Sequence, residues 1–249
     1  MLINKSSFIQ SLKYCPKIIA GESTRLGGIG KFPYESLNLG IHTDDDPKTV
    51  MENRRIFFTS LGKKEEDVAG SHQIHGDDLL MVEKPGQYEG YDALMTNKKG
   101  ILLSITIADC TPVLIYDSAN DAIAAVHAGW KGTVKKLVKK TLGQMAEHFG
   151  TRGEDCYAYI GTCIDECSFE VDADVADSFD SSFKRWDEER SKFFINLKEA
   201  NRKQLLDFGL PAAQIEVSPF STYLDNERFF SYRKENGRTG RMLAVIGLI

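Results

Sequence analysis

Three residues of this chain have the side-chain types and the positions of a metal site: His75, Cys110 and His127. Imidazole nitrogen and thiolate sulfur are ligands that zinc prefers, and three protein ligands leave a fourth position open, as in catalytic zinc sites. Each of the three lies at the end of an expected strand, where reactive side chains are often presented. Their wide separation matches no short ligand motif, so ordinary structural histidines and a buried thiol are the alternative.

The residues next to these three support a site at the strand ends. Segment 108–112 (A-D-C-T-P) puts a carboxylate, a thiol and a proline between two apolar strands. Asp109 would be costly to bury unless it is hydrogen-bonded or orients a neighbour, so we expect it to orient a metal ligand, with proton acceptor as its alternative role. His127 leads into segment 128–133 (A-G-W-K-G-T), whose glycines predict a tight turn into a helix.

The other histidines and cysteines carry weaker signals. We expect His148 to lie on the polar side of a helix and His42 to lie in a loop beside three aspartates. Three of the remaining cysteines lack the paired spacing of a zinc knuckle, which favours structural thiols at Cys156, Cys163 and Cys167. Cys15, which precedes Pro16, shows no evident role. Two basic clusters, 53–55 and 231–241, contain arginines suited to phosphate or carboxylate, although solvated surface charge is the simpler interpretation.

The apolar spacing predicts helices and strands that alternate along the chain. Asp46 and Pro47 predict the start of a helix that ends at Gly62, a second helical pattern runs from Val134 to Gly150, and Asn196 with Glu199 predicts a capping box for a third. Strands are expected at 100–107, 112–117, 122–126, 215–218, 229–232 and 242–249, with a turn at 118–121. Hairpins with helices between them indicate an α+β fold with mixed sheets.

Composition places the chain among ordinary globular proteins. It has 249 residues, 42% hydrophobic and 27% charged, with 31 Lys+Arg against 36 Asp+Glu and a net charge of -5. This length suits one domain, which we expect to span residues 1–249. The mild acidity argues against a nucleic-acid partner, and the longest apolar stretch is too short to span a membrane. Five cysteines without an export signal predict a cytoplasmic protein.

Ordered motifs along nearly the whole chain resemble those of the laccase-domain family, also called multicopper polyphenol oxidases and peptidoglycan editing factors, whose members include purine nucleoside phosphorylases. The matching segments are 23–28, 36–40, 45–47, 53–54, 73–76, 91–94, 108–112, 127–132, 229–233 and 239–242. The resemblance implies an αββα sandwich of mixed sheets and a zinc ion held by His75, Cys110 and His127. Lys131 departs from the family's usual arginine, and Ser221 stands where cysteine is common.

The resemblance implies a zinc-dependent purine nucleoside phosphorylase that acts on adenosine, inosine and methylthioadenosine, with adenosine deaminase as a side activity. Cys110 and Asp109 are then the catalytic candidates. The candidates for binding purine nucleoside and phosphate are Asn38, Arg54, Gln73, Lys131 and Arg233. The sequence motifs H-x-E and P-C-x-x-C of zinc-dependent cytidine-type deaminases are absent, so deamination would need a different arrangement of catalytic residues.

Three alternatives to this function are to be compared with the sequence. The editing branch of the family suggests an amidohydrolase that removes a miscoupled serine from a UDP-MurNAc peptidoglycan precursor, with Cys110 as ligand or nucleophile. Four-copper laccase chemistry needs roughly ten imidazoles by coordination preference, and this chain has five histidines. A single copper ion could still substitute for zinc. A non-enzymatic metal-binding partner protein is the third alternative, and the oligomeric state is left open.

Overall fold

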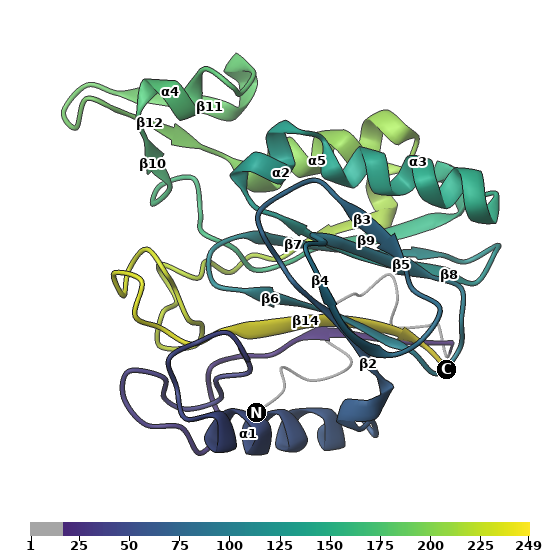
Figure 1. Cartoon of the computed structure of the whole chain (residues 1–249). Helices are drawn as coiled ribbons and strands as arrows, with labels where there is room; N and C mark the ends of the chain where they lie inside the picture. The colour runs from purple at the N-terminus through teal and green to yellow at the C-terminus, as the bar shows by residue number, and fades with distance from the viewer. Residues whose placement is uncertain (1–16) are drawn as a thin grey trace.

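The computed structural model describes residues 17–249, and their helices and strands stack in four layers (Figure 1). Helix α1 (Pro47–Ser60) covers the outer face of a five-stranded sheet. A six-stranded sheet packs on that sheet's inner face, and the fourth layer consists of α2 (Trp130–Val134), α3 (Leu137–Phe149) and α5 (Leu197–Phe208). This arrangement confirms the expected α+β class and the αββα sandwich.

Both large sheets are mixed. The first has the order β1-β14-β6-β2-β4, formed by Ile18–Glu22, Met242–Leu248, Leu102–Ile107, Val68–His72 and Gly86–Glu89. The second has the order β13-β9-β7-β8-β5-β3, formed by Ile215–Val217, Cys156–Ile160, Thr111–Asp117, Ala122–Ala128, Ala93–Thr96 and Leu79–Met81. Single-turn 3₁₀ helices precede four strands, at Glu65–Asp67, Gly153–Asp155, Ser181–Phe183 and Ala212–Gln214.

A third, small sheet projects from the sandwich beside α2 (Figure 1). Its order is β10-β12-β11, formed by Glu170–Val171, Lys192–Ile195 and Lys184–Asp187, with the short helix α4 (Ala173–Ala176) packed on β12. It has its own apolar cluster, which includes Phe169, Phe179 and Ile195. The loop that enters this sheet contributes side chains to the site described below.

The central strands are buried on both faces, as their continuous apolar sequences predict. In β7, Leu114 and Tyr116 face the other sheet, whereas Val113 and Ile115 pack against the layer of α3 and α5. The same alternation recurs in β8 and β6. Three apolar clusters therefore stack through the sandwich, one between each pair of neighbouring layers.

The predicted helix ends are confirmed, with one interruption. The Asp46 side chain accepts hydrogen bonds from the first main-chain N–H groups of α1, and the Asn196 side chain accepts one from Glu199. The helical pattern predicted from Val134 to Gly150 is broken, because Lys136 adopts a left-handed conformation (φ 60°) between α2 and α3. The turn predicted at 118–121 joins β7 to β8.

The strand predicted at 229–232 is wrong. Phe229 and Phe230 are fully buried, but their main-chain N–H groups donate to Asp225 O and to Met242 Sδ rather than to a neighbouring strand. The apolar residues that suggested a strand instead anchor a loop against the edge of the sheet-to-sheet core. This loop carries Tyr232 and Arg233 to the site.

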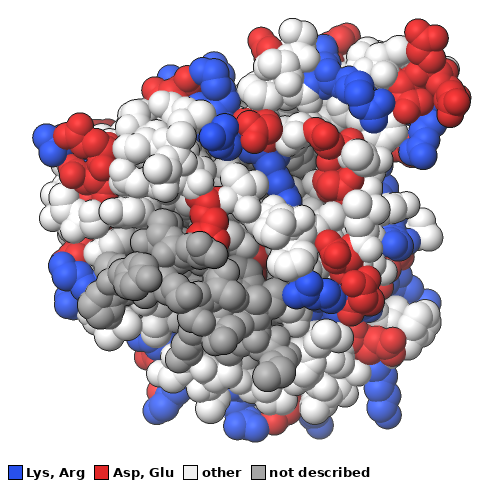
Figure 2. Space-filling view, turned by 180° about the vertical axis from the view of Figure 1, so that it is seen from behind, with Lys and Arg blue, Asp and Glu red and all other residues white. Residues whose placement is uncertain are grey.

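The surface matches the mild net charge. Figure 2, which views the molecule from behind, shows Lys and Arg intermixed with Asp and Glu over the described residues. Among residues 17–249, no helix is both long enough and apolar enough to cross a bilayer.

Candidate metal centre and its pocket

The three predicted metal ligands meet at one end of the sandwich. Cys110 lies where the chain crosses from β6 in one sheet to β7 in the other. His127, near the end of β8, is the register partner of Pro112 in β7, which places it beside Cys110. His75 follows β2, which runs parallel to β6 and so ends at the same edge. Chain segments that are distant in sequence therefore converge here because of strand direction.

The ligand atoms of His75, Cys110 and His127 all lie within 4.8 Å of one another. The two imidazole rings are 5.0 Å apart between centroids and nearly perpendicular, at 78°. Gly129 leaves the approach clear, because a Cβ atom there would lie 3.0 Å from the Cys110 sulfur and 3.3 Å from His75 Cδ2. Two nitrogens, one sulfur and a fourth side kept open fit a catalytic zinc site, so the residues present suit such an ion.

One carboxylate, that of Asp92, positions both histidines. It is fully buried, and its Oδ1 is 2.8 Å from His127 Nδ1, which leaves Nε2 as the metal-facing nitrogen. The same carboxylate accepts main-chain hydrogen bonds from Ile74, His75 and Gly76 at 3.3, 3.1 and 2.7 Å. These bonds hold His75 in its left-handed conformation (φ 57°). Metal-binding histidines are usually fixed by such carboxylates.

The electrostatics favour the metal-binding form of the cysteine. Burial opposes ionisation of the Cys110 thiol, but His127 and His75 outweigh it and lower the pKa of Cys110 to about 6. Burial likewise disfavours a charged His127, yet Cys110 and Asp92 raise the pKa of His127 to about 9. Thiolate is the form of cysteine that binds metal, and a bound metal would displace the proton from His127.

Gln73 lines the pocket but is occupied in holding the strand ends together. Its side-chain amide donates to Thr106 O and accepts from both the main-chain N–H and the hydroxyl of Thr106, at 2.7–3.0 Å. These bonds extend the pairing of β2 with β6 beyond the end of β2. Gln73 therefore positions the segment that delivers His75.

Asp109 ties the metal-ligand segment to the loop that follows β13. Its carboxylate accepts hydrogen bonds from Thr222 Oγ1 and from the main-chain N–H of Arg233, each at 2.6 Å. The Asp109 backbone has φ 90°, a conformation that L residues rarely adopt. Strained conformations of this kind persist where the surroundings fix them. The two hydrogen bonds to the Asp109 carboxylate anchor the part of the pocket wall that carries Tyr232 and Arg233.

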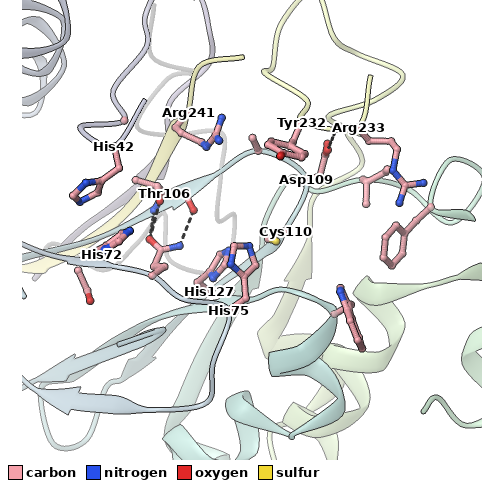
Figure 3. Close-up of a pocket in the computed structure, with 17 residues that line it drawn as sticks. His42, His72, His75, Thr106, Asp109, Cys110, His127, Tyr232, Arg233 and Arg241 are labelled. Atoms are coloured by element: carbon pink, nitrogen blue, oxygen red, sulfur yellow. Dashed lines mark hydrogen bonds between the residues drawn. The ribbon is translucent and has the colours of Figure 1, made fainter. Parts of the chain in front are cut away.

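The three predicted ligands line a pocket of about 510 Å³, within the size range of small-molecule sites. Figure 3 shows His42, His72 and Arg241 on one side of the ligands, and Tyr232, Asp109 and Arg233 on the other. The second side also includes Trp130, Ile164 and Phe169. One side thus carries a guanidinium and two imidazoles, and the other carries the aromatic residues together with Arg233 and Asp109.

Three of the predicted binding residues do not line this pocket. Arg54 is 2% exposed, and its guanidinium is bonded to Glu65 and to Leu39 O. Asn38 is fully buried and bonds to Thr43, Asp45 and the main chain. Lys131 is exposed, with its ammonium over the Trp130 ring. Arg233 lines the pocket, donates to Glu170 O and lies over Phe169.

Residues 19–249 match the model of the multi-copper polyphenol oxidoreductase laccase family. The chain belongs to this family. A relative from Bacteroides thetaiotaomicron, named purine nucleoside phosphorylase, is 36% identical over 242 residues, covering 90% of this chain and 89% of the relative. A Deinococcus radiodurans protein of the same name is 40% identical over 228 residues, covering 91% and 87%.

Solved structures agree with the fold. The crystal structure of the Bacillus licheniformis hypothetical protein YfiH has a TM-score of 0.91 and 30% identity and covers 95% of both chains. YlmD from Geobacillus stearothermophilus has a TM-score of 0.89 and 33% identity and covers 94% of this chain and 92% of its own. The family's description refers to several copper ions, which would need several ligand groups. Within residues 17–249, only one group of three or more His, Cys, Asp or Glu side chains is arranged to hold a metal ion, and it consists of His75, Cys110 and His127.

Several residues of the site carry no clear signal in the sequence. Asp92 belongs to a matched motif (91–94), but nothing in its neighbourhood shows that a carboxylate there reaches two histidines. Arg241 lies in the basic cluster near the C-terminus, in which the sequence predicts Arg233 as the residue that binds nucleoside or phosphate. Trp130 and Phe169 have no chemical signal of their own, because an aromatic residue looks the same in a core and in a pocket.

Proposed function

We propose that this chain is a zinc-dependent purine nucleoside phosphorylase whose substrates are adenosine, inosine and methylthioadenosine. The observation that carries the proposal is that His75, Cys110 and His127 lie together and line a pocket of about 510 Å³. Relatives with 36% and 40% identity over nearly their full length are named for this activity. The two unlike walls of the pocket provide for the two unlike substrates, a nucleoside and a phosphate.

We assign the purine base to the aromatic wall. Trp130, Phe169 and Tyr232 offer flat apolar surfaces, and Ile164 adds aliphatic surface between them. Planar heterocycles gain from stacking and from leaving water on such a surface. Arg233 lies over the Phe169 ring, with Cζ 5.4 Å from the ring centroid, and so extends the same wall outward.

Phosphorolysis breaks the bond between the purine nitrogen and the ribose C1′, while an oxygen of phosphate forms a new bond to C1′. A zinc ion, when bound, would supply a Lewis acid. Cys110 and His127 hold their metal-binding geometry through Asp92 and Gly129. Asp109 positions the wall that carries Tyr232 and Arg233, since both of its carboxylate oxygens already accept hydrogen bonds. The proposal thus assigns Cys110 a ligand role and Asp109 a positioning role.

The proposal includes a side activity as an adenosine deaminase, in which water replaces the amino group at C6 of the purine and ammonia leaves. It also includes the cytoplasm as the working compartment. Support for the compartment comes from Cys110, Cys156, Cys163 and Cys167, which are all free thiols, the usual state of cysteines in a reducing environment. We prefer zinc to copper as the metal, because neither phosphorolysis nor deamination changes an oxidation state and zinc has no redox chemistry.

The test is chromatography of adenosine and inosine after incubation with the zinc-loaded protein, with and without phosphate. We expect adenine and hypoxanthine to appear only with phosphate, and inosine to form slowly from adenosine in both conditions. Cys110→Ala should abolish all three products, and metal analysis should show that it no longer retains zinc. Unchanged turnover in Cys110→Ala would refute the site assignment. The absence of any purine product from zinc-loaded wild type would refute the proposed function and favour the amidohydrolase alternative.

A further inference from the structure

Arg241 is held in place by the segment that lies opposite it. Leu39 N–H donates to Arg241 O at 3.0 Å, and the Arg241 N–H donates to Asn38 Oδ1 at 2.8 Å. Gly40 lies directly under the arginine, because a Cβ atom at Gly40 would be 2.6 Å from Arg241 Cγ. The buried Asn38, predicted to touch substrate, therefore fixes the backbone of a pocket residue.

The guanidinium of Arg241 is also fixed, but only along one edge. Its Nη1 donates to the main-chain oxygens of Thr239 and Gly240 at 2.8 and 2.9 Å, and its Cζ lies 5.5 Å from the centre of the Tyr232 ring. Within residues 17–249, Nε and Nη2 of Arg241 have no hydrogen-bond acceptor. The side chain is half-buried and lines the pocket. A preorganised, partly desolvated guanidinium with two free donor groups is suited to a planar approach by an oxyanion.

Two histidines line the same side of the pocket as Arg241 (Figure 3). His42 is two residues beyond Gly40, and its ring is stacked against that of His72, with 4.2 Å between centroids. The Nδ1 of His72 is 3.0 Å from Glu89, so the opposite ring nitrogen is left for another partner. Imidazole N–H groups beside a guanidinium add hydrogen-bond donors for the same anion.

The other cationic residue of the pocket is less suited to this role. Arg233 is exposed, and its Nη1 bonds to Glu170 O while the guanidinium lies on Phe169. The carboxylate of Asp109 lies next to it, held by the Arg233 main chain. An exposed arginine is screened by solvent and attracts an anion less than the half-buried Arg241 does.

We propose that Arg241, with His42 and His72, forms the binding subsite for a tetrahedral phosphate oxyanion on the side of the pocket across from Arg233 (Figure 3). The ligand is inorganic phosphate if the subsite serves the reacting anion, and in that respect the inference rests on the proposed function. The same chemistry would recognise the 5′-phosphate of a nucleotide. The experiment below separates these two sources.

The test is isothermal titration calorimetry of inorganic phosphate into zinc-loaded wild type and variants. Arg241→Met should weaken phosphate binding at least about tenfold, because hydrogen bonds between charged partners are the strong ones. His42→Ala combined with His72→Ala should weaken it about threefold. These histidines are exposed, so this double variant keeps the test valid if Arg241→Met fails to fold. Arg238→Met is the matched control, because Arg238 is an exposed arginine of the same loop outside the pocket.

Two comparisons identify the source of the phosphate. If the subsite binds the reacting anion, Arg241→Met raises the KM for phosphate and leaves the KM for inosine near the wild-type value. If the subsite binds a nucleotide, inosine 5′-monophosphate binds wild type more tightly than inosine does, and Arg241→Met removes that gain. Either result supports a phosphate subsite at Arg241.

The inference is overturned if Arg241→Met and the double histidine variant both bind phosphate as wild type does. It is also overturned if phosphate binding is lost only in Arg233→Met or only when zinc is removed. Arg241-dependent phosphate binding without any phosphorolysis would instead refute the proposed function alone. Normal phosphorolysis with an unchanged phosphate KM in Arg241→Met, together with unchanged affinity of that variant for inosine 5′-monophosphate, would refute the inference alone.

Discussion

Asp92→Asn tests how far one carboxylate holds the metal centre together. The Asp92 carboxylate accepts four N–H groups, three from the main chain at 74–76 and one from His127. An amide of the same shape offers one acceptor oxygen, so at most two of these bonds survive and the amide N–H₂ faces the remaining donors. The substitution therefore disturbs His75 and His127 together without changing the volume of the side chain.

The expected size of the effect follows from these lost bonds. Loss of a hydrogen-bonded partner behind a ligating histidine typically costs 10–100-fold in metal affinity. The lost bonds to a buried charged acceptor should lower the free energy of unfolding by about 2–4 kcal/mol. We expect both effects in Asp92→Asn, measured by zinc competition against a chromogenic chelator and by thermal unfolding followed by circular dichroism.

The pH dependence provides an internal check. Burial would raise the pKa of Asp92, but hydrogen bonds from His127 and from the main chain outweigh it and hold that pKa below its ordinary value. A carboxyl with a lowered pKa stabilises the fold above its unfolded pKa of about 3.9, and the contribution is lost as pH falls through the folded value. The stability difference between wild type and Asp92→Asn should therefore be present at pH 6 and shrink in stronger acid.

Asp78→Asn is the matched control, since it removes the same charge from an exposed carboxylate whose main-chain oxygen accepts from Asp92 N–H. It should leave zinc affinity unchanged. The reasoning would be refuted if Asp92→Asn also bound zinc as wild type does, with a stability change below about 0.5 kcal/mol, the range of ordinary surface substitutions.

Two further predictions concern the same centre. Gly129→Ala should lower zinc affinity about tenfold with the fold intact, because the new Cβ would lie 3.0 Å from the Cys110 sulfur. The control is Gly143→Ala in α3, where nothing lies near the new Cβ. This variant should bind zinc as wild type does and gain about 0.5–1 kcal/mol of stability. Equal zinc affinity in both variants would contradict this. In chelator-treated protein, the rate at which iodoacetamide modifies Cys110 should rise with pH and reach half its maximum near pH 6, and bound zinc should protect the thiol. Burial raises the pKa of Cys156 to about 12, so Cys156 should stay unmodified at neutral pH. A Cys110 midpoint between pH 8 and 9 would show that the histidines do not lower its pKa.

The fold was largely predictable because its signals are local. Apolar runs such as those of β6 and β7 indicate strands buried on both faces, and Asp46 and Asn196 indicate where helices begin. The prediction failed at 229–232, where the apolar residues fill the core from a loop. Hydrophobic pattern reports burial, and only main-chain pairing distinguishes a buried strand from a buried loop. That one domain spans the whole chain stays a prediction.

The grouping of His75, Cys110 and His127 at strand ends was predictable from the sequence, and their role as metal ligands stays a prediction. The residues that support them were not predictable. Asp92 is 35 residues from His127, and its role exists only because β5 pairs with β8. Arg54 and Arg241 illustrate the opposite difficulty, since both are arginines in basic clusters. One is bonded to Glu65 away from the pocket, and the other faces the cavity. Which arginine is free to bind a ligand depends on tertiary contacts that spacing does not encode.

The most direct test of the account is ³¹P NMR of zinc-loaded protein incubated with inosine and inorganic phosphate. A zinc-dependent phosphorylase should give a new phosphate ester signal, that of ribose 1-phosphate, which grows in step with the hypoxanthine released in the same sample. Cys110→Ala should give neither product. Hypoxanthine without the ester would mean hydrolysis rather than phosphorolysis. Either that result or the absence of both products from the zinc-loaded wild type would contradict the account.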